Sequence, residues 1–173
     1  MNTIIEFSHV VAGYDSKSIL KELNLEIKEG DFWGIIGPNG GGKSTFIKTL
    51  IGLLKPLSGS IRYFRKGSSV SSLEVGYLPQ YSMFDKKFPI SVEEVVRSGL
   101  DRNCSSLLLR LNREQRQKVD SVLELVGMFN QRKEPIGELS GGQLQRTFLG
   151  RAIVSSPELL VLDEPQSYMD KNF

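Results

Sequence analysis

Residues 37–45 read GPNGGGKST and have the composition of a phosphate-binding loop. They match the pattern G-x-x-x-x-G-K-S/T, in which glycines let backbone amides approach phosphate oxygens that a Cβ atom would exclude. The lysine supplies a cation for the β- and γ-phosphates, and the following hydroxyl is a ligand for Mg²⁺. The alternative is an ordinary glycine-rich turn. We expect a nucleotide-binding loop made of Gly37, Pro38, Asn39, Gly40, Gly41, Gly42, Lys43, Ser44 and Thr45.

Two adjacent acidic residues follow an apolar run in LLVLDEP, residues 159–165. At the end of a strand, Asp163 would reach Mg²⁺, usually through water. Glu164 could orient or deprotonate the water that attacks a phosphate. The alternative is a solvated acidic turn, and the phosphate loop upstream favours the catalytic interpretation.

A second glycine-rich helix start occurs at LSGGQ, residues 139–143. The unpaired amides and the positive dipole end of such a helix favour an anion. Because the chain already has one phosphate loop, we expect this second start to contact a nucleotide held elsewhere. The alternative is an ordinary capped helix. The residues concerned are Ser140, Gly141, Gly142 and Gln143.

Short apolar runs alternate with helical patterns, which predicts an α/β protein with a largely parallel sheet. Capping and stop signals predict four helices. We expect strands at 4–7, 32–36, 75–78 and 159–162, and helices at 43–51, 91–99, 112–127 and from 140 to before 157. The stretch from about 81 to 135 has no good strand and is interpreted as a helical insertion. Residues 68–72 are interpreted as a polar loop.

A length of 173 residues predicts one domain, or one and a fraction, and 39% hydrophobic and 24% charged residues are typical of a globular protein. A net charge of +2 does not suggest a nucleic-acid partner. A single cysteine, Cys104, predicts a reduced, intracellular protein. No apolar run approaches the roughly 18 residues of a membrane span. We therefore expect any role at a membrane to require partner subunits.

The arrangement of LSGGQ between a phosphate loop and LLVLDEP resembles the ATP-binding cassette (ABC) ATPases across almost the whole chain. The resemblance implies a P-loop NTPase core with a helical insertion at about 81–135 and an N-terminal β region, in a single domain 1–173. It also implies that Tyr14 stacks on adenine, although a half-buried strand-end tyrosine is the alternative. Gln80 would sense Mg²⁺ and the γ-phosphate, and Asp170 would contact the opposite subunit.

The family resemblance implies hydrolysis of ATP with Mg²⁺ by a head-to-tail dimer of cassettes. Such a dimer drives transmembrane permease subunits from the cytoplasmic face of the membrane. DKKFPISVEEVVRSGL, residues 85–100, with VGYLPQ resembles the cassettes of zinc and manganese importers. The alternatives are an importer of another substrate, a nucleotide-binding module without turnover, and a soluble ABC ATPase of repair or translation type. The last class usually carries coiled-coil insertions or a second cassette, and this sequence shows neither.

The sequence departs from the family in one respect. ABC ATPases carry a histidine after the residue corresponding to Asp170, on a strand that inserts between those of the phosphate loop and of Asp163. The only histidine here is His9, and residue 173 follows Asp170 by three positions. We therefore expect a truncated cassette with an incomplete central sheet.

Overall fold

The computed structural model describes residues 2–80, 89–100 and 111–163. The chain forms two compact units, which we call the N-terminal unit, Met1–Leu73, and the C-terminal unit, Glu74–Phe173. In the described ranges no helix has both the length and the apolar character needed to cross a membrane. Each unit is described by itself.

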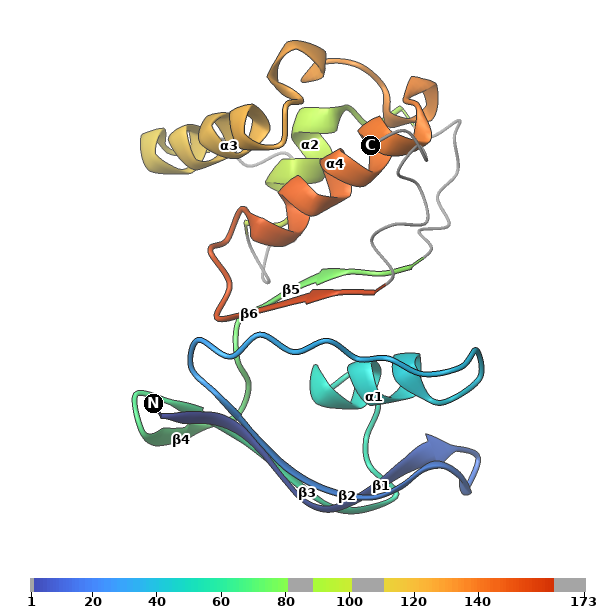
Figure 1. Ribbon diagram of the computed structural model, residues 1–173. Helices are drawn as coiled ribbons and strands as arrows, with labels where there is room; N and C mark the ends of the chain where they lie inside the picture. Colours follow the sequence, from blue (N-terminus) through green and yellow to red (C-terminus); the bar gives the residue numbers. More distant parts are fainter. Residues whose placement is uncertain (1, 81–88, 101–110, 164–173) are drawn as a thin grey trace. The chain divides into compact units, whose positions relative to one another are not determined.

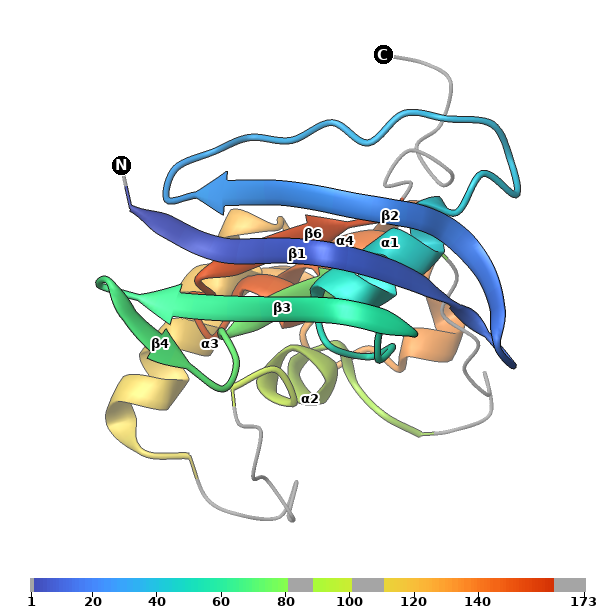
Figure 2. The same ribbon diagram turned by 90° about the horizontal axis from the view of Figure 1, so that it is seen from below.

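The N-terminal unit is built on a four-stranded antiparallel sheet in the order β2-β1-β3-β4 (Figure 2). Its strands are β1 Thr3–Tyr14, β2 Lys17–Lys28, β3 Ser58–Arg65 and β4 Ser68–Val70. The strand predicted at 4–7 is confirmed and lies within β1. The polar loop predicted at 68–72 is wrong for its first three residues. As an edge strand, β4 pairs only with β3 and has little apolar surface to bury, so its sequence resembles a loop.

A two-residue turn joins β1 to β2. Asp15 and Ser16 both have left-handed backbones, with φ of 48° and 63°. Two consecutive left-handed residues form the turn that matches the twist of a hairpin. A Cβ atom on Gly13 would lie 1.9 Å from the carbonyl oxygen of Lys17, so only glycine fits there. The turn places Tyr14 at the very end of β1.

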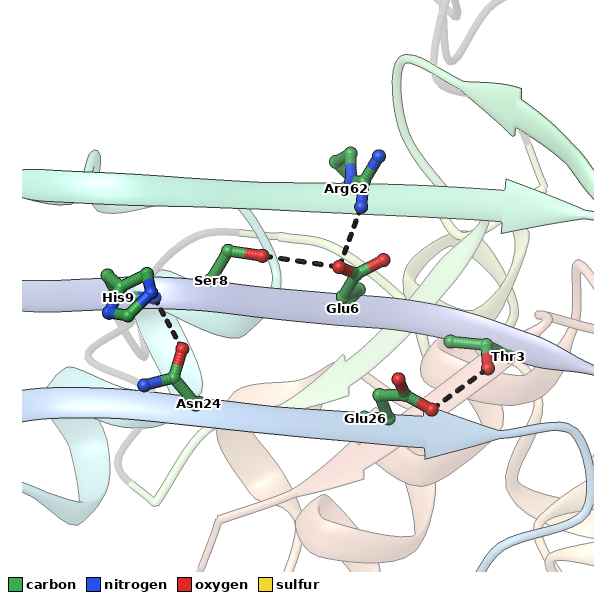
Figure 3. A network of polar contacts seen from close by, with 7 residues as sticks. All are labelled: Thr3, Glu6, Ser8, His9, Asn24, Glu26 and Arg62. Carbon is green, nitrogen blue, oxygen red and sulfur yellow. Dashed lines mark hydrogen bonds and ion pairs between the residues drawn. The ribbon is translucent and has the colours of Figure 1, made fainter.

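Polar side chains on one face of this sheet link β1 to both of its neighbours. Figure 3 shows Thr3, Glu6, Ser8, His9, Asn24, Glu26 and Arg62. Arg62 on β3 donates to Glu6 at 2.7 Å, and this hydrogen bond holds the pKa of Glu6 below its usual range. On the other side, the His9 amide donates to the Asn24 side chain on β2 at 2.7 Å.

The opposite face of the sheet is apolar and packs against α1, Lys43–Leu50 (Figure 1). The Phe7 and Phe46 rings stack with their centroids 5.7 Å apart. The β1 residues Ile5, Phe7, Val10 and Ala12 are all at most 2% exposed. This helix confirms the prediction for 43–51 and leads directly out of the phosphate loop.

The strand predicted at 32–36 is wrong. Residues 31–38 adopt no regular structure, and Phe32 and Ile36 are 98% and 97% exposed. A buried strand must pair its backbone groups with a neighbour. No strand of the described residues lies beside 32–36, since the sheets have the orders β2-β1-β3-β4 and β5-β6. The expectation of an incomplete sheet is thereby confirmed.

The C-terminal unit contains two parallel strands, β5 Val75–Leu78 and β6 Leu159–Leu162, as predicted. Helix α4, Gly141–Ile153, packs closely on β5. A Cβ atom on Gly76 would lie 2.1 Å from the Ala152 carbonyl oxygen. The backbone of the helix therefore contacts the backbone of the strand directly.

Helices α2, Val92–Arg97, and α3, Arg113–Leu125, complete this unit with α4 (Figure 1). Two 3-10 turns, η1 Phe129–Gln131 and η2 Ile136–Glu138, lie between α3 and α4. All three helices begin with a capping box, and each begins where the sequence predicted a helix start. Their shared core consists of Val92, Val96, Val119, Leu123, Val126, Met128 and Val154. The larger division into one domain with an insertion at 81–135 stays a prediction.

Candidate functional site

The phosphate loop of the N-terminal unit is shaped by glycines. Gly40 and Gly42 have left-handed backbones, with φ of 79° and 87°. A Cβ atom on Gly41 would lie 2.9 Å from the Pro38 carbonyl oxygen, and one on Gly42 would lie 2.7 Å from Leu20 Cδ2. The loop is exposed from Gly37 to Gly41. These positions leave a cradle of backbone that side chains would fill.

The first turn of α1 offers hydrogen-bond donors to this cradle. Gly42 is the N-cap and provides no side-chain cap. The first intrahelical bond runs from the Phe46 amide to the Gly42 carbonyl, at 2.8 Å. The amides of Lys43, Ser44 and Thr45 therefore have no acceptor within the helix. Such a set of donors at a helix N-terminus fits a polyphosphate.

The Lys43 ammonium lies across the same loop. It donates to the carbonyl oxygens of Gly37 at 2.9 Å and Pro38 at 3.1 Å. An ammonium carries three donors, so these two carbonyls leave one hydrogen for a phosphate oxygen. The cation is thus held at the loop before any ligand arrives.

The other predicted residues of the N-terminal unit lie in the loop, at the start of α1 and at the end of β1. Ser44 is partly exposed at the start of α1, where its hydroxyl can serve as a Mg²⁺ ligand. Thr45 is 6% exposed, and its carbonyl accepts a hydrogen bond from the Thr49 hydroxyl at 2.7 Å. Asn39 is exposed in the loop. Tyr14, at the hairpin end, is 41% exposed and can offer a ring face to a base.

In the C-terminal unit, Gln80 and Asp163 follow the carboxyl ends of the paired strands β5 and β6. Leu78 and Leu162 are register partners, and the Asp163 amide donates to the Leu78 carbonyl at 2.9 Å. Asp163 is 6% exposed, whereas Gln80 is exposed. The structure therefore brings these two predicted residues to the same edge of the sheet.

The sequence reading missed Tyr77, which neighbours Asp163. Burial raises the pKa of the Tyr77 phenol, and the charge and hydrogen bonding of Asp163 raise it further. Tyr77 pairs in register with Val161, so it lies on the same face as Asp163, two residues on. Strand alternation could have revealed this contact only once the pairing of β5 with β6 was known.

The LSGGQ segment, residues 139–143, forms the start of α4. The Ser140 hydroxyl accepts from the Gln143 amide at 3.3 Å, and the Gln143 side chain accepts from the Ser140 amide at 2.8 Å. Gly141 and Gly142 occupy the first turn. The predicted capped helix is confirmed, and the predicted contact with a nucleotide stays a prediction.

The predicted site residues therefore form two groups, one in each unit. Tyr14 and residues 37–45 belong to the N-terminal unit, whereas Gln80, Asp163 and residues 140–143 belong to the C-terminal unit. Glu164 and Asp170 lie outside the described residues, as does Cys104.

Comparison with known proteins identifies the family of this chain. The family model described as ABC transporter matches residues 20–167. The zinc uptake system ATP-binding protein ZurA of Listeria innocua is 42% identical over 98% of this chain and 67% of its own length. The manganese transport system ATP-binding protein MntB of Bacillus subtilis is 38% identical over 96% of this chain and 66% of its own length.

The solved structures that resemble this chain are also ABC transporters and ATP-binding cassettes. The chain matches an inward-facing metal-chelate type ABC transporter with a TM-score of 0.80 and 28% identity, over 98% of this chain and 63% of the other. It matches a dimeric ATP-binding cassette bound to ADP and Pi with a TM-score of 0.76 and 25% identity, covering 97% and 77%. The chain spans about two thirds of the length of the relatives. With its phosphate loop and its P-loop NTPase fold, the chain belongs to the ABC transporter family.

Proposed function

We propose that this chain binds and hydrolyses ATP as the cassette of an ABC transporter that imports zinc or manganese. The observation that carries the proposal is the glycine cradle of residues 37–42, beside which three helix amides lack an intrahelical acceptor and the Lys43 ammonium lies across the loop. The metal is inferred from relatives named for zinc and manganese transport.

The proposed roles follow from residue chemistry. Tyr14 stacks on the adenine, the phosphate loop holds the triphosphate, and Glu164 accepts a proton from the attacking water. Ser44, Gln80 and Asp163 are the proposed Mg²⁺ ligands, by hydroxyl, amide and carboxylate oxygens. When bound, Mg²⁺ would neutralise charge on the phosphates. The Ser44 hydroxyl in the N-terminal unit and the buried Asp163 carboxylate in the C-terminal unit are each oxygen donors of the kind that a hard cation takes.

The proposed partners are a second cassette and membrane permease subunits. In a head-to-tail dimer, residues 140–143 of each copy would complete the nucleotide site of the other. We propose that the permease binds at an open groove of about 340 Å³ in the C-terminal unit. The groove is lined by Ser91, Glu93, Glu94, Arg97, Arg132 and Lys133. Its mixed charges suit a polar protein segment. The chain would then lie on the cytoplasmic face of the membrane.

Two measurements test this proposal. The chain should release phosphate from ATP with Mg²⁺, and Glu164→Gln should bind ATP but release none. Cells whose own gene carries the Lys43→Ala change should lose uptake of radioactive zinc or manganese, and the metal affected identifies the cargo. Normal phosphate release by Glu164→Gln would show that Glu164 is not the base. Unchanged uptake of both metals in the Lys43→Ala cells would contradict the transport role.

A nucleotide-binding module without turnover is the second candidate. It is favoured by the missing strand at 32–36, because an unpaired segment does not fix the phosphate loop as a sheet strand would. Under this candidate the chain binds ATP, yet its phosphate release stays at the level of Lys43→Ala. Phosphate release that depends on Glu164 excludes it.

A further inference from the structure

A lysine outside the phosphate loop lies over the ring of Tyr14, the residue predicted to stack on adenine. The ammonium of Lys48, in the last turn of α1, lies 5.9 Å from the centroid of the Tyr14 ring. A cation within about 6 Å of an aromatic face is attracted by the negative charge above the ring. None of the sequence motifs includes Lys48, and its spacing from Lys43 gives no reason to single it out.

The Tyr14 ring is partly exposed, so a contact with Lys48 would restrict its rotation. Tyr14 is the last residue of β1, it is 41% exposed, and the next two residues form the turn. A strand-end tyrosine with an exposed ring can rotate about its side-chain torsions. An ordered ring loses less conformational entropy when a ligand stacks on it.

Helix α1 connects the phosphate cradle to this ring. Lys43 begins the helix and Lys48 lies five residues later, about 7.5 Å along the axis. The other end of the connection is also fixed, because Gly42 approaches Leu20 on β2, the strand paired with β1. The cradle and the ring are thus attached to one hairpin within the N-terminal unit.

We infer that Lys48 is a positioning residue for the nucleobase: it holds the Tyr14 ring from one face while the base stacks on the other. The inference rests on the proposed ATP binding and adds a residue to it. Lys48 acts through Tyr14, so its effect requires both the aromatic ring and a base in the ligand. It contributes nothing to the binding of a bare polyphosphate.

The test compares two probes, ATP and inorganic tripolyphosphate, bound to the full chain by calorimetry. Lys48→Met should weaken ATP binding about two- to fivefold and leave tripolyphosphate binding unchanged. Lys48→Arg keeps a cation and should bind ATP as the unmodified chain does. Lys55→Met is the matched control, since Lys55 is an exposed lysine just after the same helix.

A double-mutant cycle with Tyr14→Ala completes the test. In the Tyr14→Ala background, Lys48→Met should cause no further loss of ATP affinity. If Lys48→Met weakens the binding of ATP and of tripolyphosphate equally, Lys48 contacts the phosphates. If the losses of ATP affinity from Lys48→Met and Tyr14→Ala are additive, Lys48 contacts the base directly. Either result overturns the inference and leaves ATP binding intact. Failure of the unmodified chain to bind ATP would instead overturn the proposed function.

Folding of the variants is checked separately. The Lys48 carbonyl accepts from the Leu53 and Leu54 amides, at 2.8 and 3.0 Å, and these backbone bonds do not depend on the side chain. Lys48→Gln is a second neutral variant and should repeat the result of Lys48→Met. Both should retain the far-ultraviolet circular dichroism of the unmodified chain. If Lys48→Gln keeps full ATP affinity, the inference is wrong.

Discussion

Two glycine-rich helix starts differ in how their backbone donors are used. At α1, Gly42 is left-handed and gives no side-chain cap, so three amides and the Lys43 ammonium are directed to the loop. At α4, Ser140 and Gln143 cap each other, and the glycines that follow are ordinary helical residues. Glycine content alone therefore does not identify a phosphate site. The conformation of the N-cap and the presence of a capping side chain distinguish the two.

This difference has a consequence for ligands. The α1 start has no internal acceptors for its amides, so a phosphate oxygen adds hydrogen bonds without replacing any. At the start of α4, the Gln143 amide already donates to the Ser140 hydroxyl. We expect α1 to bind a nucleotide within its own unit, and α4 to need further groups from another surface.

The largest expected effect is that of Lys43→Ala on nucleotide binding. The substitution removes the ammonium that both holds the loop carbonyls and reaches the phosphates. A charge-assisted hydrogen bond is worth about 1.5–3 kcal/mol, so ATP affinity should fall about 10- to 150-fold. Calorimetry with ATP and Mg²⁺ measures this, with Lys55→Ala as control. Unchanged affinity would contradict the phosphate-loop assignment.

A matched pair of glycine substitutions compares the two helix starts directly. Gly42→Ala should destabilise the N-terminal unit by about 1–3 kcal/mol, because its φ is 87° and its Cβ would meet Leu20. Gly141→Ala should be neutral or stabilise the C-terminal unit by up to about 1 kcal/mol, because alanine favours a helix. Urea unfolding followed by the fluorescence of Trp33, the only tryptophan, reports the N-terminal unit. Equal effects of the two substitutions would remove the distinction.

Removing the cap of α4 should have a smaller effect. Ser140→Ala should cost about 1 kcal/mol of C-terminal unit stability, since the Gln143 amide loses its acceptor. Ser140→Asn, which keeps an N-cap acceptor, is the control. Urea unfolding followed by circular dichroism at the helix band measures both. No loss with alanine would show that α4 is not stabilised by this box.

The smallest expected effect is a dependence of stability on pH, which the capping box of α2 should show and that of α4 should not. The α2 box uses a carboxylate: the Ser91 hydroxyl and amide donate to Glu94 at 2.6 and 2.8 Å and hold the pKa of Glu94 below its usual range. A lowered folded pKa gives stability that is present above the ordinary value near 4.3 and is lost as pH falls through the folded value.

In Glu94→Gln, the free energy of unfolding of the C-terminal unit should therefore fall less than in the unmodified chain as the pH is lowered from about 5 to 3. The α4 box uses an amide, so Gln143→Ala should lower stability by the same amount at every pH in this range. Urea midpoints across this range check both statements. A Glu94→Gln slope equal to that of the unmodified chain would contradict the assignment to Glu94.

The helices were the part of the fold that sequence could predict. Their starts are encoded locally, in Ser91 with Glu94, Asn112 with Gln115 and Ser140 with Gln143, and these pairs lie within one turn. The phosphate loop was equally readable because its residues are contiguous. The structure confirms the helices without any long-range information, and the role of the loop as a nucleotide site stays a prediction.

The strands were harder to predict because they depend on distant partners. Asp15 and Ser16 form the turn of the β1–β2 hairpin, and neither is the asparagine or glycine that usually marks such a turn. The apolar run at 32–36 looked like a strand, but a strand forms only beside another one. The Lys48–Tyr14 contact joins a helix to a hairpin and could not be found before their packing was known.

The close approach of α4 to β5 at Gly76 has a mechanical consequence. Because the Ala152 carbonyl lies where a Gly76 side chain would stand, the helix cannot move closer to the strand at this point without a backbone collision. Helix α4 has 13 residues and acts as a stiff lever about 20 Å long, anchored near its carboxyl end. We therefore expect a force applied at Ser140 to be passed along the helix to β5, and so to the edge of the sheet that carries Gln80 and Asp163.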